Sequence, residues 1–174
     1  YISEARLDEA WKLSLEALFL SKNEAQIWEL ICFQLEEKKL PVAGELEKLA
    51  DFYDSWFGTW AALKETKSSF DKQKILQKME SLYIKGERAL AFLTEYTGIL
   101  GEDEKYEKIR AIIWETKSQS DNPLPWQLLM HGGQALLALK KHTELNELVK
   151  ELKLRQDVPH WVIDELENKD NKVH

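Results

Sequence analysis

The sequence predicts an all-α protein of about ten helices, and two features of its 174 residues lead to that prediction. Glycine and proline are scarce, with seven Gly and four Pro, whereas a sheet-rich fold needs many tight turns. Apolar side chains recur at steps of three and four residues, which places them on one face of a helix. We find no alternating segment long enough to predict a strand.

Apolar stripes define the helices, and short polar segments separate them. The stripes are Ala10, Leu13, Ala17 and Leu20; Ile27, Trp28, Ile31 and Leu35; Leu46, Leu49 and Tyr53; Tyr106, Ile109 and Ile113; and Leu145, Leu148, Val149 and Leu152. The clearest loop is 121–125, where two prolines lie too close together for a helix interior. We also expect a bend from Gly98 to Gly101. Because the links are short, consecutive helices should be antiparallel neighbours.

A repeat of nearly constant length runs through the chain. Trp28 and Trp60 are 32 residues apart, and further steps of 33, 36 and 34 residues lead to Leu93, Leu129 and Ile163. Each of these residues should occupy the same place in the first helix of a helix pair. A period near 34 residues is typical of solenoids, in which each pair packs on the next. The alternatives are an irregular helical repeat and a closed helix bundle, which also gives amphipathic helices.

The repeat carries a pattern of residue types at equivalent places. These residues are Trp28, Ile31, Cys32, Leu35, Ala43 and Ala50; Trp60, Leu63, Leu76 and Tyr83; Leu93, Tyr96, Leu100, Tyr106, Ile109 and Ile113; and Leu129, Gly133, Leu136, Leu145, Val149, Leu152 and Pro159. The pattern resembles the tetratricopeptide (TPR) family, with W-x2-L-G-x2-Y in the first helix and A-x3-F in the second. The resemblance implies a right-handed α-solenoid of antiparallel helix hairpins. A half-a-TPR (HAT) variant is an alternative, because Trp and Tyr are frequent in the first helices.

The resemblance makes the whole chain, 1–174, a single TPR-like domain. It implies that 3–20 is a lone helix of the kind that comes second in a pair, matched through Ala10, Ser14, Ala17 and Leu18. Repeat units follow at 25–56, 57–89, 90–125 and 126–159, with a capping helix at 160–168. The second unit departs most from the family, because Lys64 occupies the place of its usual small residue.

The same resemblance implies that the first helices line a concave, peptide-binding groove. The predicted groove residues are Gln26, Glu29, Phe33, Glu36, Glu37, Ala61, Glu65, Thr94, Glu102, Gln127, Met130, Gln134 and Leu137. Trp56 and Trp126 lie beside loops and are further candidates, because exposed Trp is a strong interface anchor. None of the groove residues is Lys or Asn, so the family's clamp on a C-terminal carboxylate is not expected. We predict a partner peptide with basic and apolar residues, the alternative being that these Glu residues only keep the surface soluble.

No sequence motif indicates catalysis, a metal site or a cofactor. The chain has no nucleophile elbow, no P-loop and no H-E-x-x-H. Its histidines, His131, His142, His160 and His174, are at least eleven residues apart. Gly132-Gly133 is better explained by close helix packing than by a nucleotide-binding loop, and the single Cys32 by burial among apolar neighbours. We therefore predict a non-enzymatic protein without catalytic residues, metal or cofactor.

The net charge of −7 argues against direct binding to nucleic acid or to an anionic membrane. No run approaches the roughly 20 apolar residues of a membrane span, and no signal peptide is visible, so we expect a cytoplasmic location. Because the sequence starts at Tyr1 rather than Met, a lost signal or partner domain stays open. The leading prediction is a scaffold or adaptor that binds a protein partner. The alternative is a helical accessory domain of a larger enzyme or RNA-processing assembly, and the oligomeric state stays open.

Overall fold

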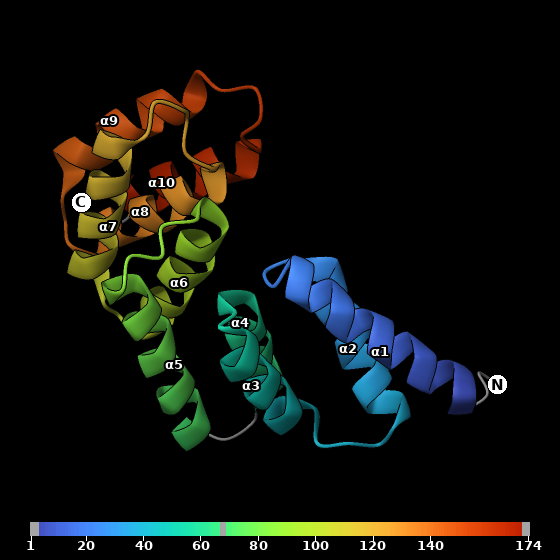
Figure 1. Cartoon of the computed structure of the whole chain (residues 1–174). Helices are drawn as coiled ribbons and strands as arrows, with labels where there is room; N and C mark the ends of the chain where they lie inside the picture. Colours follow the sequence, from blue (N-terminus) through green and yellow to red (C-terminus); the bar gives the residue numbers. More distant parts are fainter. Residues whose placement is uncertain (1–3, 67–68, 172–174) are drawn as a thin grey trace. The chain divides into compact units, whose positions relative to one another are not determined.

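A computed structural model describes residues 4–66 and 69–171. These residues form ten α-helices and no strand, which confirms the predicted fold class (Figure 1). The helices are α1 (Glu4–Leu20), α2 (Ala25–Glu37), α3 (Val42–Tyr53), α4 (Trp56–Glu65), α5 (Ser69–Ile84), α6 (Leu90–Glu102), α7 (Tyr106–Gln119), α8 (Trp126–Ala138), α9 (His142–Lys153) and α10 (His160–Asn171). The chain divides into two compact units, unit 1 (Tyr1–Glu87) and unit 2 (Arg88–His174).

Unit 1 is built from α1 to α5, and each of these helices packs against the next, while α2 also packs against α4. Its core is centred on Trp28, which is fully buried and donates a hydrogen bond from Nε1 to the Lys22 carbonyl at 2.7 Å. Ser55 caps α4 by accepting from the Gly58 amide at 3.0 Å, and its hydroxyl donates to the same Lys22 carbonyl at 2.6 Å. The α1–α2 turn is therefore held to the start of α4.

Unit 2 repeats this neighbour pattern with α6 to α10. Each helix packs against the next, and α8 also contacts α6 and α10. The double glycine of α8 permits the close approach: a Cβ at Gly132 would lie 2.6 Å from Ile113 Cδ1, and one at Gly133 would lie 2.7 Å from Leu166 Cδ1. The predicted role of these glycines in helix packing is confirmed.

Ion pairs join the second helices of consecutive pairs in both units. In unit 2, Arg110 binds Glu144 through Nε and Nη2 at 2.8 and 2.9 Å, and Lys117 pairs with Glu151; both pairs are 34 residues apart. In unit 1, Lys78 of α5 pairs with Glu47 of α3 at 2.8 Å. Charged side chains of consecutive second helices therefore reach each other within each unit.

One turn geometry recurs at the ends of α2, α6 and α8, and the same hydrogen bond also ends α3 (Ser55 to Ala50, 2.9 Å) and α5 (Glu87 to Leu82, 3.0 Å). A residue with positive φ follows α2, α6 and α8, namely Lys39 (57°), Glu104 (56°) and Lys140 (57°). The next amide donates to the carbonyl five residues earlier: Leu40 to Leu35 (3.0 Å), Lys105 to Leu100 (2.9 Å) and Lys141 to Leu136 (2.9 Å). This is the Schellman pattern, which normally uses Gly at the positive-φ position.

Lys39→Gly and Lys140→Gly should each raise the free energy of unfolding, by about 1 kcal/mol, because Gly adopts positive φ without the steric cost that Lys carries. Urea unfolding followed by circular dichroism measures the change. Lys150→Gly is the matched control, because Lys150 is exposed inside α9, where Gly costs about 1 kcal/mol. A loss of stability at Lys39 and Lys140 as well would contradict this explanation.

Three details of the sequence prediction are wrong. In α1, packing on α2 buries Ser14 and Leu18, whereas Leu13 and Leu20 of the predicted stripe are 60% and 85% exposed. The expected bend at 98–101 is absent, because α6 runs through both glycines. The place of Trp28, Leu93 and Leu129, three residues after the helix start, is taken in α4 by buried Thr59 and not by Trp60. The first residues of α2 and α4, Ala25 and Trp56, are 31 residues apart, whereas Trp28 and Trp60 are 32 apart. Trp60 therefore lies one position further along its helix than Trp28 does.

Candidate partner-binding site

Unit 1 has a surface hollow of about 600 Å³ between α2 and α4, which we call the α2–α4 hollow. Its lining from α2 is Ala25, Trp28, Glu29, Cys32, Phe33 and Glu36, and its lining from α4 is Phe57, Trp60, Ala61, Lys64 and Glu65. The side chains reach it because positions three and four residues apart share one face of each helix. The hollow thus combines aromatic rings with a rim of charged groups.

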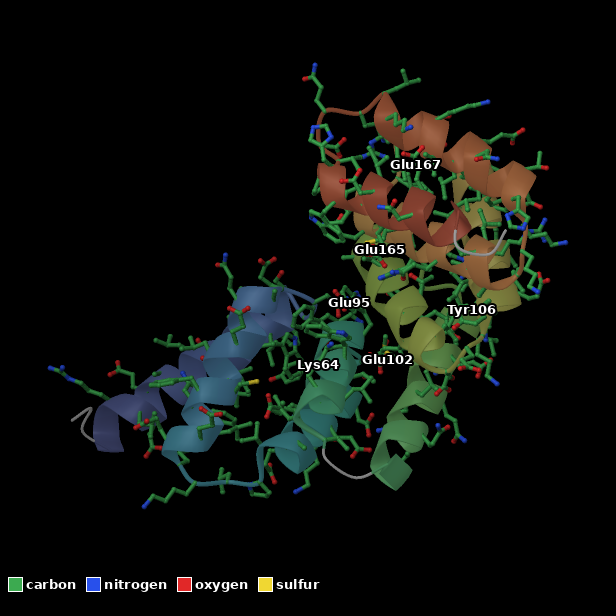
Figure 2. All side chains as sticks on the ribbon, turned by 180° about the vertical axis from the view of Figure 1, so that it is seen from behind. Lys64, Glu95, Glu102, Tyr106, Glu165 and Glu167 are labelled. Carbon is green, nitrogen blue, oxygen red and sulfur yellow. The ribbon has the colours of Figure 1, made fainter. Side chains whose placement is uncertain are left out.

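The aromatic part of the hollow presents ring faces and edges. Phe57 and Trp60 lie with their centroids 5.0 Å apart, and the Phe33 side chain is 46% exposed. The Lys64 ammonium lies 5.3 Å from the Trp60 ring centroid, within the range of a cation–π contact. Figure 2 labels Lys64 on α4. The Trp60 ring therefore already contacts one cation from its own helix.

Three carboxylates give the hollow a negative field. Burial raises the pKa of the Cys32 thiol to about 11, and Glu65, Glu36 and Glu29 add to that shift by repelling a thiolate. Cys32 is half-buried rather than enclosed in the core. At neutral pH it stays protonated and is a poor nucleophile. The same field that opposes a thiolate favours a bound cation.

The structure brings together five of the predicted groove residues in this hollow: Glu29, Phe33, Glu36, Ala61 and Glu65. Gln26 and Glu37 are exposed on α2 and do not line it. Trp56 is only 5% exposed, so the prediction that it is an exposed anchor is wrong; the side chain packs where α4 begins. Trp60 and Phe57 were not predicted as lining residues, because the repeat spacing assigned Trp60 to the core.

Unit 2 has a pocket of about 510 Å³, which we call the α6–α8 pocket. Its lining is Thr97, Gly98, Gly101 and Glu102 of α6, Tyr106 and Ile109 of α7, and His131, Gln134, Ala135, Leu137 and Ala138 of α8. Figure 2 shows Glu102 on α6 and Tyr106 on α7. The predicted residues Glu102, Gln134 and Leu137 line it. The predicted residues Thr94, Gln127 and Met130 do not line this pocket. Trp126 does not line it either: the side chain is half-buried and meets the Trp161 ring edge-on, with the ring centroids 6.0 Å apart.

His131 is the titratable group most enclosed by this pocket. Its Nδ1 lies 2.9 Å from the Thr97 hydroxyl, and burial lowers the pKa of the imidazole below 6.5. The folded state therefore favours the neutral ring, whereas the unfolded chain takes up a proton near pH 6.5.

Stability should fall as the pH drops below about 6.5, by at most about 1.4 kcal/mol per pH unit for this one proton. His131 contributes fully above its unfolded pKa, and the contribution declines as the unfolded chain becomes protonated. Urea unfolding at pH 7 and pH 5.5 measures this. His131→Gln should remove the difference, whereas His160→Gln, at an exposed position, should keep it. An unchanged difference in His131→Gln would show that another group is responsible.

Comparison with known proteins gave no match: no family model, no curated protein and no solved structure matches this chain. Among the described residues, no three His, Cys, Asp or Glu side chains are grouped so as to hold a metal ion. Within the same ranges no helix combines the length and apolar character needed to cross a membrane. The fold and the α2–α4 hollow define an all-helical protein with an acidic, aromatic surface cavity.

Proposed function

We propose that this protein is a non-catalytic scaffold or adaptor, and that its α2–α4 hollow binds a partner peptide with basic and apolar residues. The observation that carries the proposal is the placement of Glu29, Glu36 and Glu65 around aromatic side chains in one hollow. A basic side chain would place its cation on the Trp60 ring, displacing the Lys64 ammonium, with the carboxylates supplying opposite charge. An apolar neighbour in the peptide would cover Phe33 and Phe57.

We further propose that the helix pairs are stacked as in a right-handed, TPR-like solenoid. Two observations within the units support this. The first helices of consecutive pairs contact each other, α2 with α4 and α6 with α8. The second helices of the same pairs, α3 with α5 and α7 with α9, are linked by ion pairs. Stacked hairpins that contact only their neighbours bring first helices against first helices. Such a stack leaves one face of these first helices open for a ligand.

Selection from a random library of 12-residue peptides, with the full chain as bait, tests the proposed function. We expect Arg or Lys to be enriched close to aromatic or aliphatic residues, and binding of the selected peptides to weaken as salt rises. Phe33→Ser should reduce recovery of these peptides. Phe52→Ser is the matched control, because Phe52 is 81% exposed on α3 and does not line the hollow. Enrichment of acidic peptides, or equal recovery by both variants, would refute the proposal.

A further inference from the structure

The α6–α8 pocket has a floor of small residues. Gly98 and Gly101 of α6 and Ala135 and Ala138 of α8 line it. A Cβ at Gly101 would meet only Ile109 Cδ1 at 3.9 Å, an ordinary contact, so the space beside this glycine is open. Small residues at these positions are not needed for a bend, since α6 is continuous here. They leave a depression wide enough for a long side chain.

One hydrogen bond constrains the His131 ring: Nδ1 lies 2.9 Å from the Thr97 hydroxyl oxygen. The Thr97 hydroxyl is within donating distance of two carbonyls, Leu93 at 2.8 Å and Thr94 at 3.0 Å. With its proton directed to either carbonyl, the hydroxyl oxygen accepts from Nδ1–H. With the proton on Nδ1, Nε2 carries the lone pair. Nε2 lies over Gly98, 3.6 Å from the position of a Cβ there.

Two further acceptors line the same pocket. The Gln134 amide nitrogen donates to Glu165 at 3.3 Å, which leaves its carbonyl oxygen available as an acceptor. The Glu102 carboxylate is exposed at the end of α6. The eleven lining residues include no Lys and no Arg. The pocket therefore offers acceptors and negative charge, but no cation of its own.

We propose that the α6–α8 pocket binds the side chain of an arginine residue of a partner. A guanidinium has five N–H donors in one plane and no acceptor. It could therefore donate to the Glu102 carboxylate, to Nε2 of His131 and to the amide oxygen of Gln134. The aliphatic stem would lie on the small residues of the floor and against Leu137 and Ile109. This site stands on contacts within unit 2 alone and does not depend on the α2–α4 hollow.

NMR titration of the full chain with N-acetyl-L-arginine methylamide tests the site. We expect saturable shifts of the His131 ring nitrogens, largest at Nε2. Gly101→Leu should weaken binding at least about tenfold by filling the pocket, while its helix gains propensity. Gly44→Leu is the control, because Gly44 is exposed in α3 and a Cβ there meets nothing within 4 Å.

Three outcomes would overturn the site: no shift at His131, unchanged binding by Gly101→Leu, or equal binding of N-acetyl-L-lysine methylamide. A chain with Glu29, Glu36 and Glu65 replaced by Lys should still give the His131 shifts, because these residues line the hollow of unit 1. The His131 shifts of this variant therefore test the arginine site separately from the proposed peptide binding in the α2–α4 hollow.

Discussion

Gly58→Ala should lower the free energy of unfolding of unit 1 by about 3 kcal/mol, the upper part of the range for overpacked cores. A Cβ at this position would lie 2.4 and 2.5 Å from two ring atoms of Trp28 and 2.9 Å from the Ala50 Cβ. Trp28 has little freedom to move, because it is fully buried and its indole nitrogen is hydrogen-bonded to the Lys22 carbonyl. The helix α4 would have to shift away from α2 and α3.

Urea unfolding followed by circular dichroism measures this effect, with Gly44→Ala as the control. Gly44 is also a helical glycine, but a Cβ there meets nothing within 4 Å, so the substitution should stabilise the chain by up to about 1 kcal/mol. Replacing Trp28 with Leu first should make Gly58→Ala much less costly, because the ring that it strikes is gone. If both Gly→Ala variants were equally stable, the close approach of α2 and α4 would be wrong.

Reversing the charge of the α2–α4 hollow should weaken a selected basic peptide about a hundredfold at low salt. The variant replaces Glu29, Glu36 and Glu65 with Lys, so attraction to the peptide becomes repulsion at the point of contact. The loss should shrink as salt rises, since exposed charges are screened. Isothermal titration calorimetry at low and high salt measures both effects.

The matched control replaces three exposed glutamates of unit 1 that do not line the hollow, Glu9, Glu16 and Glu37, with Lys. Both variants change the net charge by the same amount. The control should lose only the small, long-range part of the attraction. If the two variants weakened binding equally, the effect would come from net charge and not from the hollow.

The sequence predicted the helices well, because amphipathic spacing and two prolines in one loop determine them locally. It also placed Glu29, Phe33 and Glu36 together, since steps of four and three residues share a helix face. In α1 the apolar spacing alone gave the wrong stripe, whereas the match to the family's second helix, through Ser14 and Leu18, gave the buried face. This helix carries two stripes, and burial of Ser14 depends on Gln34 of α2, whose amide donates to the Ser14 hydroxyl at 3.1 Å.

The sequence did not predict that Trp60 lines the α2–α4 hollow, or that Gly98 and Gly101 line the α6–α8 pocket. Trp60 reaches the hollow because α4 begins 31 residues after α2, and a constant period had placed the ring in the core. Gly98 and Gly101 form the floor of a pocket, whereas glycine in a sequence is equally typical of a bend.

Photo-cross-linking of a selected peptide can locate its binding site on the chain. The photoreactive residue p-benzoylphenylalanine would replace Phe33, which lines the α2–α4 hollow, or Phe52, which is more exposed and lies outside it. We predict a cross-link to the peptide from position 33 and none from position 52. Cross-linking from position 52 alone, or from neither position, would contradict binding in the hollow.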